Sequence, residues 1–343
     1  MPAPCPESAP LYYTTTLHIV AVCSVPINIF GLYLVLFKSP AISKYKYCVF
    51  YIQAASFFTE IQMSVVAPGY YFFPLMAGFH TNPFVGKYIK NNHVLMTIYL
   101  FFLTNEVPAI LWCFVYRHNA AENMNRDVNH SRVVKKIILV FVQVFPVLVA
   151  VGFYNSDVTK EQAREILTKS YPQCLFWLDS TFFALYDWNT NPMVAVTGVG
   201  ALILIAIFVG YGFSLGIRTM LLLHKLRFHM SQQTYRMHRT ALIGLTLQVI
   251  LPSILLILPL FVCFFVVAFD SVEHQALATN STVLIAFHSV SATIVMISAN
   301  PRYRKIVKEY FCSSCSHKKP ATSSIAVEPS STNFRRIPKN SAR

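Results

Sequence analysis

Two carboxylic acids and one histidine stand within long apolar stretches of this sequence: Glu60, Glu106 and His288. An ionisable side chain in an apolar surrounding is costly, so by default it points toward other protein groups or an enclosed cavity. Such a group contacts a ligand, holds a sodium ion or a proton, or belongs to a conformational switch. The alternative is a protonated acid that hydrogen-bonds neighbouring helices to one another. Both interpretations stay open at this point.

The polar residues on these stretches are assigned to two groups. Glu60 and Asn28 are predicted to belong to a polar network inside the protein. The second group consists of residues that an external ligand could reach. The predicted ligand-pocket residues are His93, Thr97, Glu106 and His288.

The sequence contains no recognisable catalytic constellation. Motifs of the His-x-x-x-His type, Walker-type loops and glycine-rich dinucleotide turns are all missing. The two glutamates could form an acid dyad, but no flanking protease motif accompanies them. Cys312 and Cys315 have only His317 nearby and no second cysteine pair, which argues against a zinc site. We therefore expect no enzymatic activity, no cofactor and no metal.

The composition points to a membrane protein. Of the 343 residues, 55% are hydrophobic and 12% are charged, about half the charged share of soluble domains. Seven apolar segments are long enough to cross a bilayer, and their continuous character favours helices over barrel strands. They are 17–37, 47–68, 93–115, 136–154, 193–216, 241–268 and 283–299. The predicted fold class is an all-α membrane protein with a seven-helix bundle over 17–299.

The basic residues are distributed unevenly over the connections between these segments. Of the 28 lysines and arginines, 23 fall on one alternating set of connections, which includes the C-terminal tail. Because basic loops stay in the cytoplasm, this bias predicts an external N-terminus, 1–16, and a cytoplasmic tail. The net charge of +14 then indicates topology and attraction to membrane lipids, and not a nucleic-acid partner.

The connection 217–240 is the most basic one inside the bundle, with five Lys and Arg and no acidic residue. One interpretation is a docking surface for an acidic partner, and the other is charge that only sets topology. Arg117 ends the third segment on the same side. The predicted coupling residues are Arg117, Lys225, Arg227, Arg236 and Arg239.

The residues after the last apolar segment predict a short amphipathic helix, 300–315, that lies on the inner leaflet. Its last cysteines, Cys312 and Cys315, are predicted S-acylation sites, and two unmodified thiols are the alternative. The Ser-, Thr- and Pro-rich residues 316–343 predict a disordered cytoplasmic tail.

Two features concern the side opposite to the basic one. Cys5 and Cys174 are the only cysteines there, so a disulfide between them is compatible with that oxidising side, although the sequence does not prove it. Asn280 begins a glycosylation sequon, which lies close to the last apolar segment. Residues 159–170 carry charge pairs at helical spacing and predict a helix in this region.

Several motifs resemble those of the nematode serpentine chemoreceptors, in the class I and class H branches of the Str superfamily. The resemblance covers roughly residues 17–312, and its order and spacing are more specific than any single motif. The motifs are Asn28-x-x-Gly31-x-Tyr33, Pro74-x-x-Ala77-Gly78-Phe79, Pro172-Gln173-Cys174, Gln248-x-x-x-Pro252, and Asn300-Pro301-x-Tyr303-Arg304 at the tail junction.

The resemblance implies a chemosensory, olfactory-type G protein-coupled receptor in the ciliary plasma membrane of a sensory neuron. Its implied partners are a small environmental molecule, which enters among the third, fifth, sixth and seventh helices, and a heterotrimeric G protein. Rhodopsin-like receptors carry an acidic-Arg-aromatic triplet at the end of the third helix. Here Tyr116 and His118 flank Arg117, so any ionic lock must differ.

Two alternatives stay open from the residues alone. A ligand-gated channel of the insect odorant-receptor type would have the inverted orientation, with an internal N-terminus. A proton-coupled transporter would depend on Glu106, although the sequence shows no internal repeat.

Overall fold

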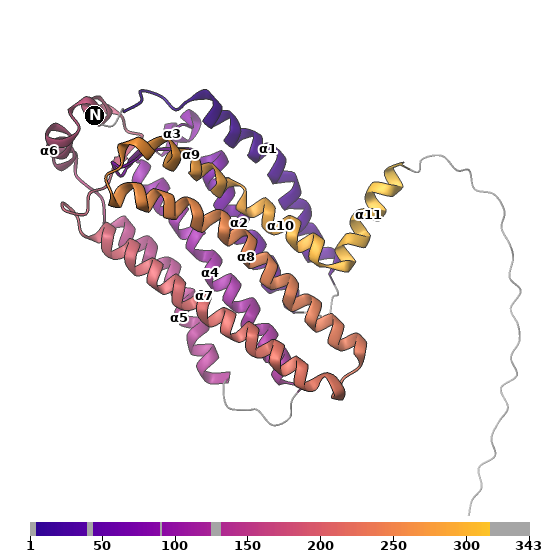
Figure 1. Ribbon diagram of the computed structural model, residues 1–343. Coiled ribbons are helices and arrows are strands. Elements are labelled where there is room, and N and C mark those ends of the chain that lie inside the picture. Colours follow the sequence, from indigo (N-terminus) through magenta and orange to yellow (C-terminus); the bar gives the residue numbers. More distant parts are fainter. Residues whose placement is uncertain (1–4, 40–43, 90, 125–131, 316–343) are drawn as a thin grey trace, which may run out of the picture. The chain divides into compact units, whose positions relative to one another are not determined.

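The structure, a computed structural model, describes residues 5–39, 44–89, 91–124 and 132–315 (Figure 1). The chain divides into two units, Met1–Arg304 and Lys305–Arg343. The first unit contains a helical bundle. In the second unit the described residues continue the helix α11 (Pro301–Cys315). The tail expected at 316–343 lies outside the described residues.

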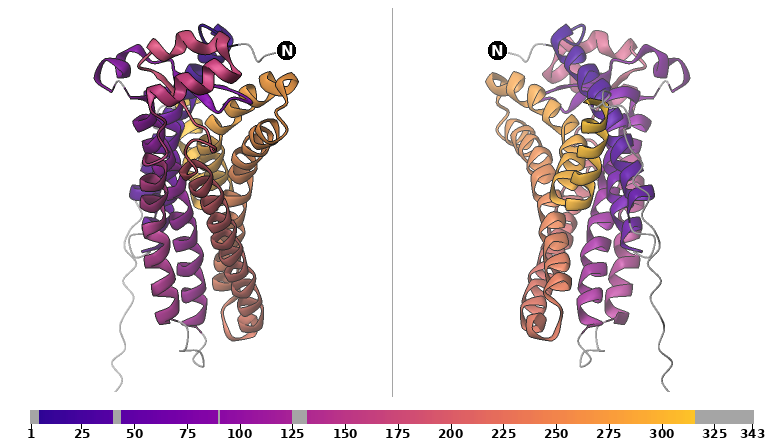
Figure 2. Two further views of the ribbon diagram at one scale, coloured as in Figure 1. Left: turned by 90° about the vertical axis from the view of Figure 1, so that its left-hand side faces the viewer. Right: turned by 90° about the vertical axis from the view of Figure 1, so that its right-hand side faces the viewer.

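Long helices dominate the first unit, and consecutive ones run in alternate directions (Figures 1 and 2). They are α1 (Leu11–Tyr33), α2 (Tyr45–Ile61), α4 (Asn92–Glu122), α5 (Arg132–Tyr154), α7 (Met193–Lys225), α8 (Gln232–Ala268), and the pair α9 (Gln275–Ala286) and α10 (His288–Ala299). Short π-helical segments, η1 (Leu34–Lys38) and η2 (Gln62–Val66), extend α1 and α2. Further short helices are α3 (Pro83–Tyr88), α6 (Lys160–Ser170), η3 (Pro172–Asp179), η4 (Leu226–His229) and η5 (Val272–His274).

Six helical segments of the described chain are long and apolar enough to cross a membrane. They are Leu11–Lys38, Asn92–Glu122, Val133–Tyr154, Met193–Phe228, Gln232–Ala268 and Val272–Ala299. The remaining segment expected from the sequence, 47–68, falls on α2 and η2. Here α2 has only 17 residues before the π-helical segment begins. The structure thus supports a multi-pass membrane protein, and it gives six spans by length and composition where seven were expected.

Small residues allow several helices to approach closely. A methyl group added to Gly31 of α1 would meet Thr293 Cγ2 of α10 at 2.6 Å, and one added to Gly152 of α5 would meet Thr197 Oγ1 of α7 at the same distance. Helices that cannot use the hydrophobic effect between them in lipid associate through such close packing. The helix α4 is central, because it packs against α2, α5 and α7.

A three-stranded antiparallel sheet corrects the all-α prediction. It consists of β1 (Gly69–Phe72), β2 (Ala77–His80) and β3 (Phe183–Leu185), in the order β1-β2-β3. Gly69 pairs with His80, and Ala77 pairs with Leu185. Strands of three or four residues are too short to show a period in the sequence. We call this end of the bundle the sheet end.

The sheet end has its own apolar core. The ring of Phe79 stacks on that of Trp177, with the centroids 4.4 Å apart. Beside them Cys5 and Cys174 form a disulfide with their Cα atoms 5.5 Å apart. The helix predicted at 159–170 is present as α6, where Thr159 and Gln162 cap its N-terminus reciprocally. The sheet, α6 and the disulfide-linked segments therefore form a cover over this end of the bundle.

Candidate functional site

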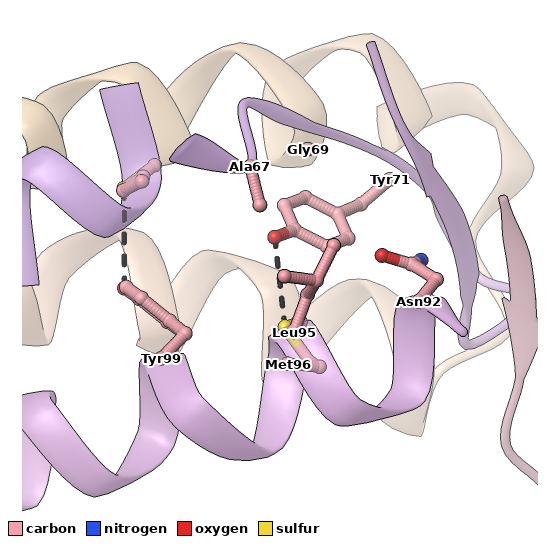
Figure 3. Close-up of a pocket in the computed structure, with 8 residues that line it drawn as sticks. Ala67, Gly69, Tyr71, Asn92, Leu95, Met96 and Tyr99 are labelled. Carbon is pink, nitrogen blue, oxygen red and sulfur yellow. Dashed lines mark hydrogen bonds between the residues drawn. The ribbon is translucent and has the colours of Figure 1, made fainter. Parts of the chain in front are cut away.

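Two adjoining hollows lie beneath the sheet, at the start of α4. The larger has a volume of about 150 Å³, and the smaller, of about 10 Å³, has room for roughly one water molecule (Figure 3). Both are bordered by Tyr71 of β1 and by Asn92 and Met96 of α4. None of the residues that line either hollow belongs to α7, α8, α9 or α10, whereas the sequence placed a ligand among later helices as well.

The walls of the larger hollow are almost entirely apolar, whereas polar and apolar atoms contribute in similar measure to the smaller one. Aromatic rings and methionine side chains dominate, and no carboxylate, ammonium or guanidinium group takes part. The larger hollow is lined by Tyr71, Phe73, Met76, Asn92, Met96 and Tyr186, with small residues of β2 and β3 between them. Apolar walls with a few convergent polar groups are typical of small-molecule sites.

Within the described residues, two phenols beside the smaller hollow donate to weak hydrogen-bond acceptors. The Tyr71 hydroxyl donates to Met96 Sδ at 3.8 Å, and the Tyr99 hydroxyl donates to Met63 Sδ at 3.9 Å (Figure 3). A thioether sulfur is a weak acceptor. Burial raises the pKa of Tyr71 above its ordinary value, so this phenol stays a neutral donor.

Two predicted pocket residues, His93 and Thr97, support the hollows instead of lining them. The His93 ring is buried, with Nδ1 3.0 Å from the Tyr186 hydroxyl and Nε2 3.0 Å from the Tyr154 carbonyl oxygen. Tyr186 in turn lines the larger hollow. Thr97 donates to the His93 carbonyl oxygen at 2.8 Å. No sequence pattern pointed to Tyr186, because it lies far from α4 along the chain.

The other two predicted pocket residues, Glu106 and His288, contact each other. His288 Nε2 lies 2.9 Å from Glu106 Oε1, and the imidazole is fully buried. His288 Nδ1 lies 2.6 Å from the Ile285 carbonyl oxygen, which can only accept, so Nδ1 carries a hydrogen. Two lone pairs facing each other at 2.9 Å would repel, and one proton therefore lies between Nε2 and Oε1. The resulting hydrogen bond connects α4 to α10.

The hydrogen bond between the His288 ring and the Ile285 carbonyl oxygen explains a break in the last span. The helix α9 ends at Ala286 and α10 begins at His288, with Phe287 between them. The break contains neither proline nor glycine. The His288 ring donates a hydrogen bond to the Ile285 carbonyl oxygen. A side chain that inserts into the backbone hydrogen bonds of a helix is a known cause of helix kinks.

Glu60 lies in the internal polar network that the sequence assigned to it. Its carboxylate accepts hydrogen bonds from Ser24 Oγ and from Asn28 Nδ2, the latter at 2.7 Å. The Thr293 hydroxyl of α10 donates to Asn28 Oδ1 and lies 2.6 Å from Gln53 Oε1. The network thus joins α1, α2 and α10. It lies next to the π-helical segment η2, a type of segment frequent at functional sites.

The end of the bundle opposite to the sheet carries the predicted coupling cations. Lys225, Arg227, Arg236 and Arg239 are exposed, and we call this end the basic end. Arg117 is less exposed: its Cζ lies 3.6 Å from the centroid of the Tyr45 ring of α2. Its Nε has no hydrogen-bond partner among the described residues. The described helices α7 and α8 contain no acidic residue, so Arg117 stacks on an aromatic ring where an ionic lock would otherwise form.

A second polar cluster at the basic end was missed by the sequence analysis. Glu122 of α4 contacts Lys135 of α5 at 2.6 Å and His118 at 3.0 Å. His118 Nδ1 lies 3.0 Å from the Thr219 hydroxyl of α7. Only the helical spacing of His118 and Glu122 could have indicated part of this cluster. It joins three helices directly beside Arg117.

Side-chain hydrogen bonds hold the tail junction, one within the junction and one to Ser39. Asn300 Oδ1 accepts from the Arg302 backbone N–H at 3.0 Å, and Pro301 begins α11. The buried Tyr303 places its hydroxyl 2.6 Å from Ser39 Oγ. The predicted acylation sites, Cys312 and Cys315, belong to α11.

Two residues at the sheet end have unusual surroundings. Burial lowers the pKa of His80, whose ring nitrogens have no hydrogen-bond partner among the described residues. Asn280, the predicted glycosylation site, lies in α9, and its Oδ1 accepts from the exposed Tyr12 hydroxyl at 2.8 Å.

Comparisons with known proteins agree with this architecture. The chain matches the family described as "Serpentine type 7TM GPCR chemoreceptor Sri" over residues 3–307. No curated protein matches it. A crystal structure of squid rhodopsin is similar with a TM-score of 0.53 and 12% sequence identity, over 90% of this chain and 88% of the rhodopsin chain. At this identity the likeness shows the fold alone. The match over residues 3–307, in contrast, establishes the family: the chain belongs to the serpentine-type 7TM GPCR chemoreceptors of the Sri family.

Proposed function

We propose that this chemosensory receptor binds a small environmental molecule at its sheet end and signals to a heterotrimeric G protein at its basic end. The observation that carries the proposal is the family match over residues 3–307, which spans the whole bundle. The geometry supports the assignment of the two ends. Apolar hollows lie at the sheet end, and exposed lysines and arginines lie at the other.

The proposed topology has seven spans, with α2 and η2 as the one that is not among the six long apolar segments. The N-terminus, 1–16, is outside, the bundle covers 17–299, and the helix at 300–315 and the tail at 316–343 are cytoplasmic. The proposed location is the plasma membrane of a sensory cilium. Within the serpentine receptors, the motifs favour the Str superfamily, in its class I or class H branch. The distribution of basic residues supports this orientation.

The remaining sites have proposed roles within this topology. Asn280 is a glycosylation site and Cys312 and Cys315 are S-acylation sites, which would anchor α11 at the inner leaflet. Ser24, Asn28, Glu60 and Thr293 form a polar network that differs between the two states of the receptor. The juxtamembrane position of Asn280, Cys312 and Cys315 supports their roles, and the hydrogen bonds that join α1, α2 and α10 support the role of the network.

Signalling requires that the ligand favours one of two packings of the bundle. Pro252 and Pro259 supply bends in α8 about which its basic end moves. Arg117 leaves the Tyr45 ring and contacts the partner together with Arg236 and Arg239. The buried Nε of Arg117, which has no hydrogen-bond partner in the described part of the chain, supports this step, because a partner would satisfy it.

The test is dissociation of a co-expressed heterotrimeric G protein in cells that display the receptor on their surface. We expect Arg117→Ala and the surface variant R236A/R239A to reduce coupling by about tenfold, since each loses at least one charged contact to the partner. Lys46→Ala is the matched control, because Lys46 also stacks on a tyrosine, with Nζ 5.2 Å from the Tyr47 centroid. A surface-expressed receptor without response to a broad odorant panel, and with the same basal signal after Arg117→Ala, would contradict the proposal.

A further inference from the structure

We infer that the hollows beneath the sheet bind a neutral, mainly apolar molecule of no more than about ten non-hydrogen atoms, whose single hydrogen-bond acceptor meets Tyr71. A ketone, ester or ether has this chemistry. The inference rests on the proposed function, because it names the class of ligand that the sheet end receives.

The size of the ligand follows from the volume of the larger hollow. About 150 Å³ is the size of an engineered apolar cavity that binds benzene. The smaller hollow adds room for about one further oxygen atom, the size of a water molecule. Met76 and Met96 are flexible and polarisable, so the walls can adapt to related shapes within this limit.

The neutral character of the ligand follows from what the walls lack. None of the residues lining the two hollows carries a charge, since Tyr71, Tyr99 and Tyr186 are phenols and Asn92 is an amide. Burial keeps the pKa values of Tyr71 and Tyr186 above the ordinary value, so neither phenol becomes an anion there. A charged ligand would lose its hydration without a counter-charge, which is strongly unfavourable.

The hydrogen-bond acceptor of the ligand is inferred from two tyrosine hydroxyls that donate to methionine sulfurs. Tyr71 donates to Met96 Sδ at 3.8 Å and Tyr99 to Met63 Sδ at 3.9 Å, and all four residues line the smaller hollow (Figure 3). An oxygen placed there would replace a weak sulfur acceptor with a strong one. One hydrogen of the Asn92 amide is used within the protein, because its Nδ2 donates to the Gly78 carbonyl oxygen at 3.2 Å. The apolar body of the ligand then lies in the larger hollow, against Phe73 and Met76.

The test measures direct binding to the purified full-length receptor in lipid nanodiscs, with no G protein present. The probes are small ketones, esters and ethers, each paired with the hydrocarbon of equal size and with a charged analogue. One such set is acetophenone, isopropylbenzene, benzoate and 1-phenylethylammonium. We expect the oxygen-bearing probes as a series to bind about three- to tenfold more tightly than their hydrocarbons, and the charged probes not to bind.

Three variants connect the binding to the hollows. Tyr71→Phe removes the donor and should abolish the preference for the oxygen-bearing probes while hydrocarbons still bind. Ala184→Ile narrows the larger hollow, which Ala184 lines, and should weaken every probe about tenfold. Tyr70→Phe is the control, because Tyr70 lines neither hollow and its ring packs on Tyr13, with the centroids 5.1 Å apart.

Two results would overturn the inference. One is binding of a charged probe as tight as that of its neutral partner. The other is a series of oxygen-bearing probes that either fails to bind or binds Tyr71→Phe and Ala184→Ile as tightly as the unaltered receptor. The proposed function is judged separately: G-protein dissociation driven by a charged molecule would leave the function standing and remove this inference. Neutral probes that bind without any signal would do the reverse.

Discussion

Glu106 and His288 share one proton across the contact between α4 and α10, and the two residues should be coupled in stability. Leucine at either position leaves the partner buried in an apolar surrounding without its hydrogen bond, at a cost of about 1–2 kcal/mol. Replacing both removes the unpaired group, so the double variant should be more stable than the sum of the single effects by about 1 kcal/mol. Thermal unfolding of the purified receptor and of Glu106→Leu, His288→Leu and the double variant measures this coupling.

Glu106→Gln is the matched control for this cycle. Its amide can still donate to His288 Nε2, so it should unfold close to the unaltered receptor. Strictly additive single effects would show that the 2.9 Å contact does not tie the two helices together.

For individual residues, the sequence identified the buried ionisable side chains but not the residues to which they are hydrogen-bonded. An acidic residue within an apolar stretch is expected to be buried, so Glu60 and Glu106 could be identified from the sequence. The partner of Glu106 is 182 positions away, and Asn28 meets Thr293 across 265 positions. No local pattern records such distances. Tyr71 and Tyr99 were missed for a related reason, because in a chain with 18 tyrosines only the position beside a hollow sets them apart.

Among the elements, the long helices could be predicted and the irregular ones could not. Apolar length alone identifies α4, α7 and α8, because a span of about twenty apolar residues has few other solutions. The sheet depends on β3, which joins the hairpin from more than a hundred residues along the chain. The break at Phe287 comes from a side chain that takes a backbone carbonyl, which no propensity of the segment indicates.

The cover over the sheet end provides a test of these elements. The disulfide between Cys5 and Cys174 spans 169 positions and lies beside Trp177, whose Nε1 donates to the Pro6 carbonyl oxygen at 3.2 Å. We expect the C5A/C174A variant to lose about 2–5 kcal/mol of stability, measured by thermal unfolding. Reductant should lower the unfolding temperature of the unaltered receptor toward that of the variant and leave the variant unchanged. Cys23→Ala, at an exposed free cysteine of α1, is the control, and an equal effect there would contradict the assignment.

For the whole molecule, charge and hydropathy act on different properties. Hydropathy sets how many segments enter the membrane. The segment formed by α2 and η2 is not among the six long apolar ones, because Gln53, Glu60 and Gln62 lower its apolar character. Burial among α1, α4 and α10 compensates, since all three side chains are nearly enclosed by protein. Charge sets the direction of the whole bundle, because the basic residues gather on one set of connections.

Two epitope tags decide both properties in one experiment. A tag before Leu11 should stain on intact cells, and a tag after Cys315 should stain only after permeabilisation. Termini on opposite sides require an odd number of crossings, so this result would make α2 with η2 a span in addition to the six long segments. Both tags on one side would mean an even number and would leave α2 short of crossing. The reverse staining pattern would keep the odd number but turn the basic end outward, where no G protein could reach Arg117, Arg236 or Arg239.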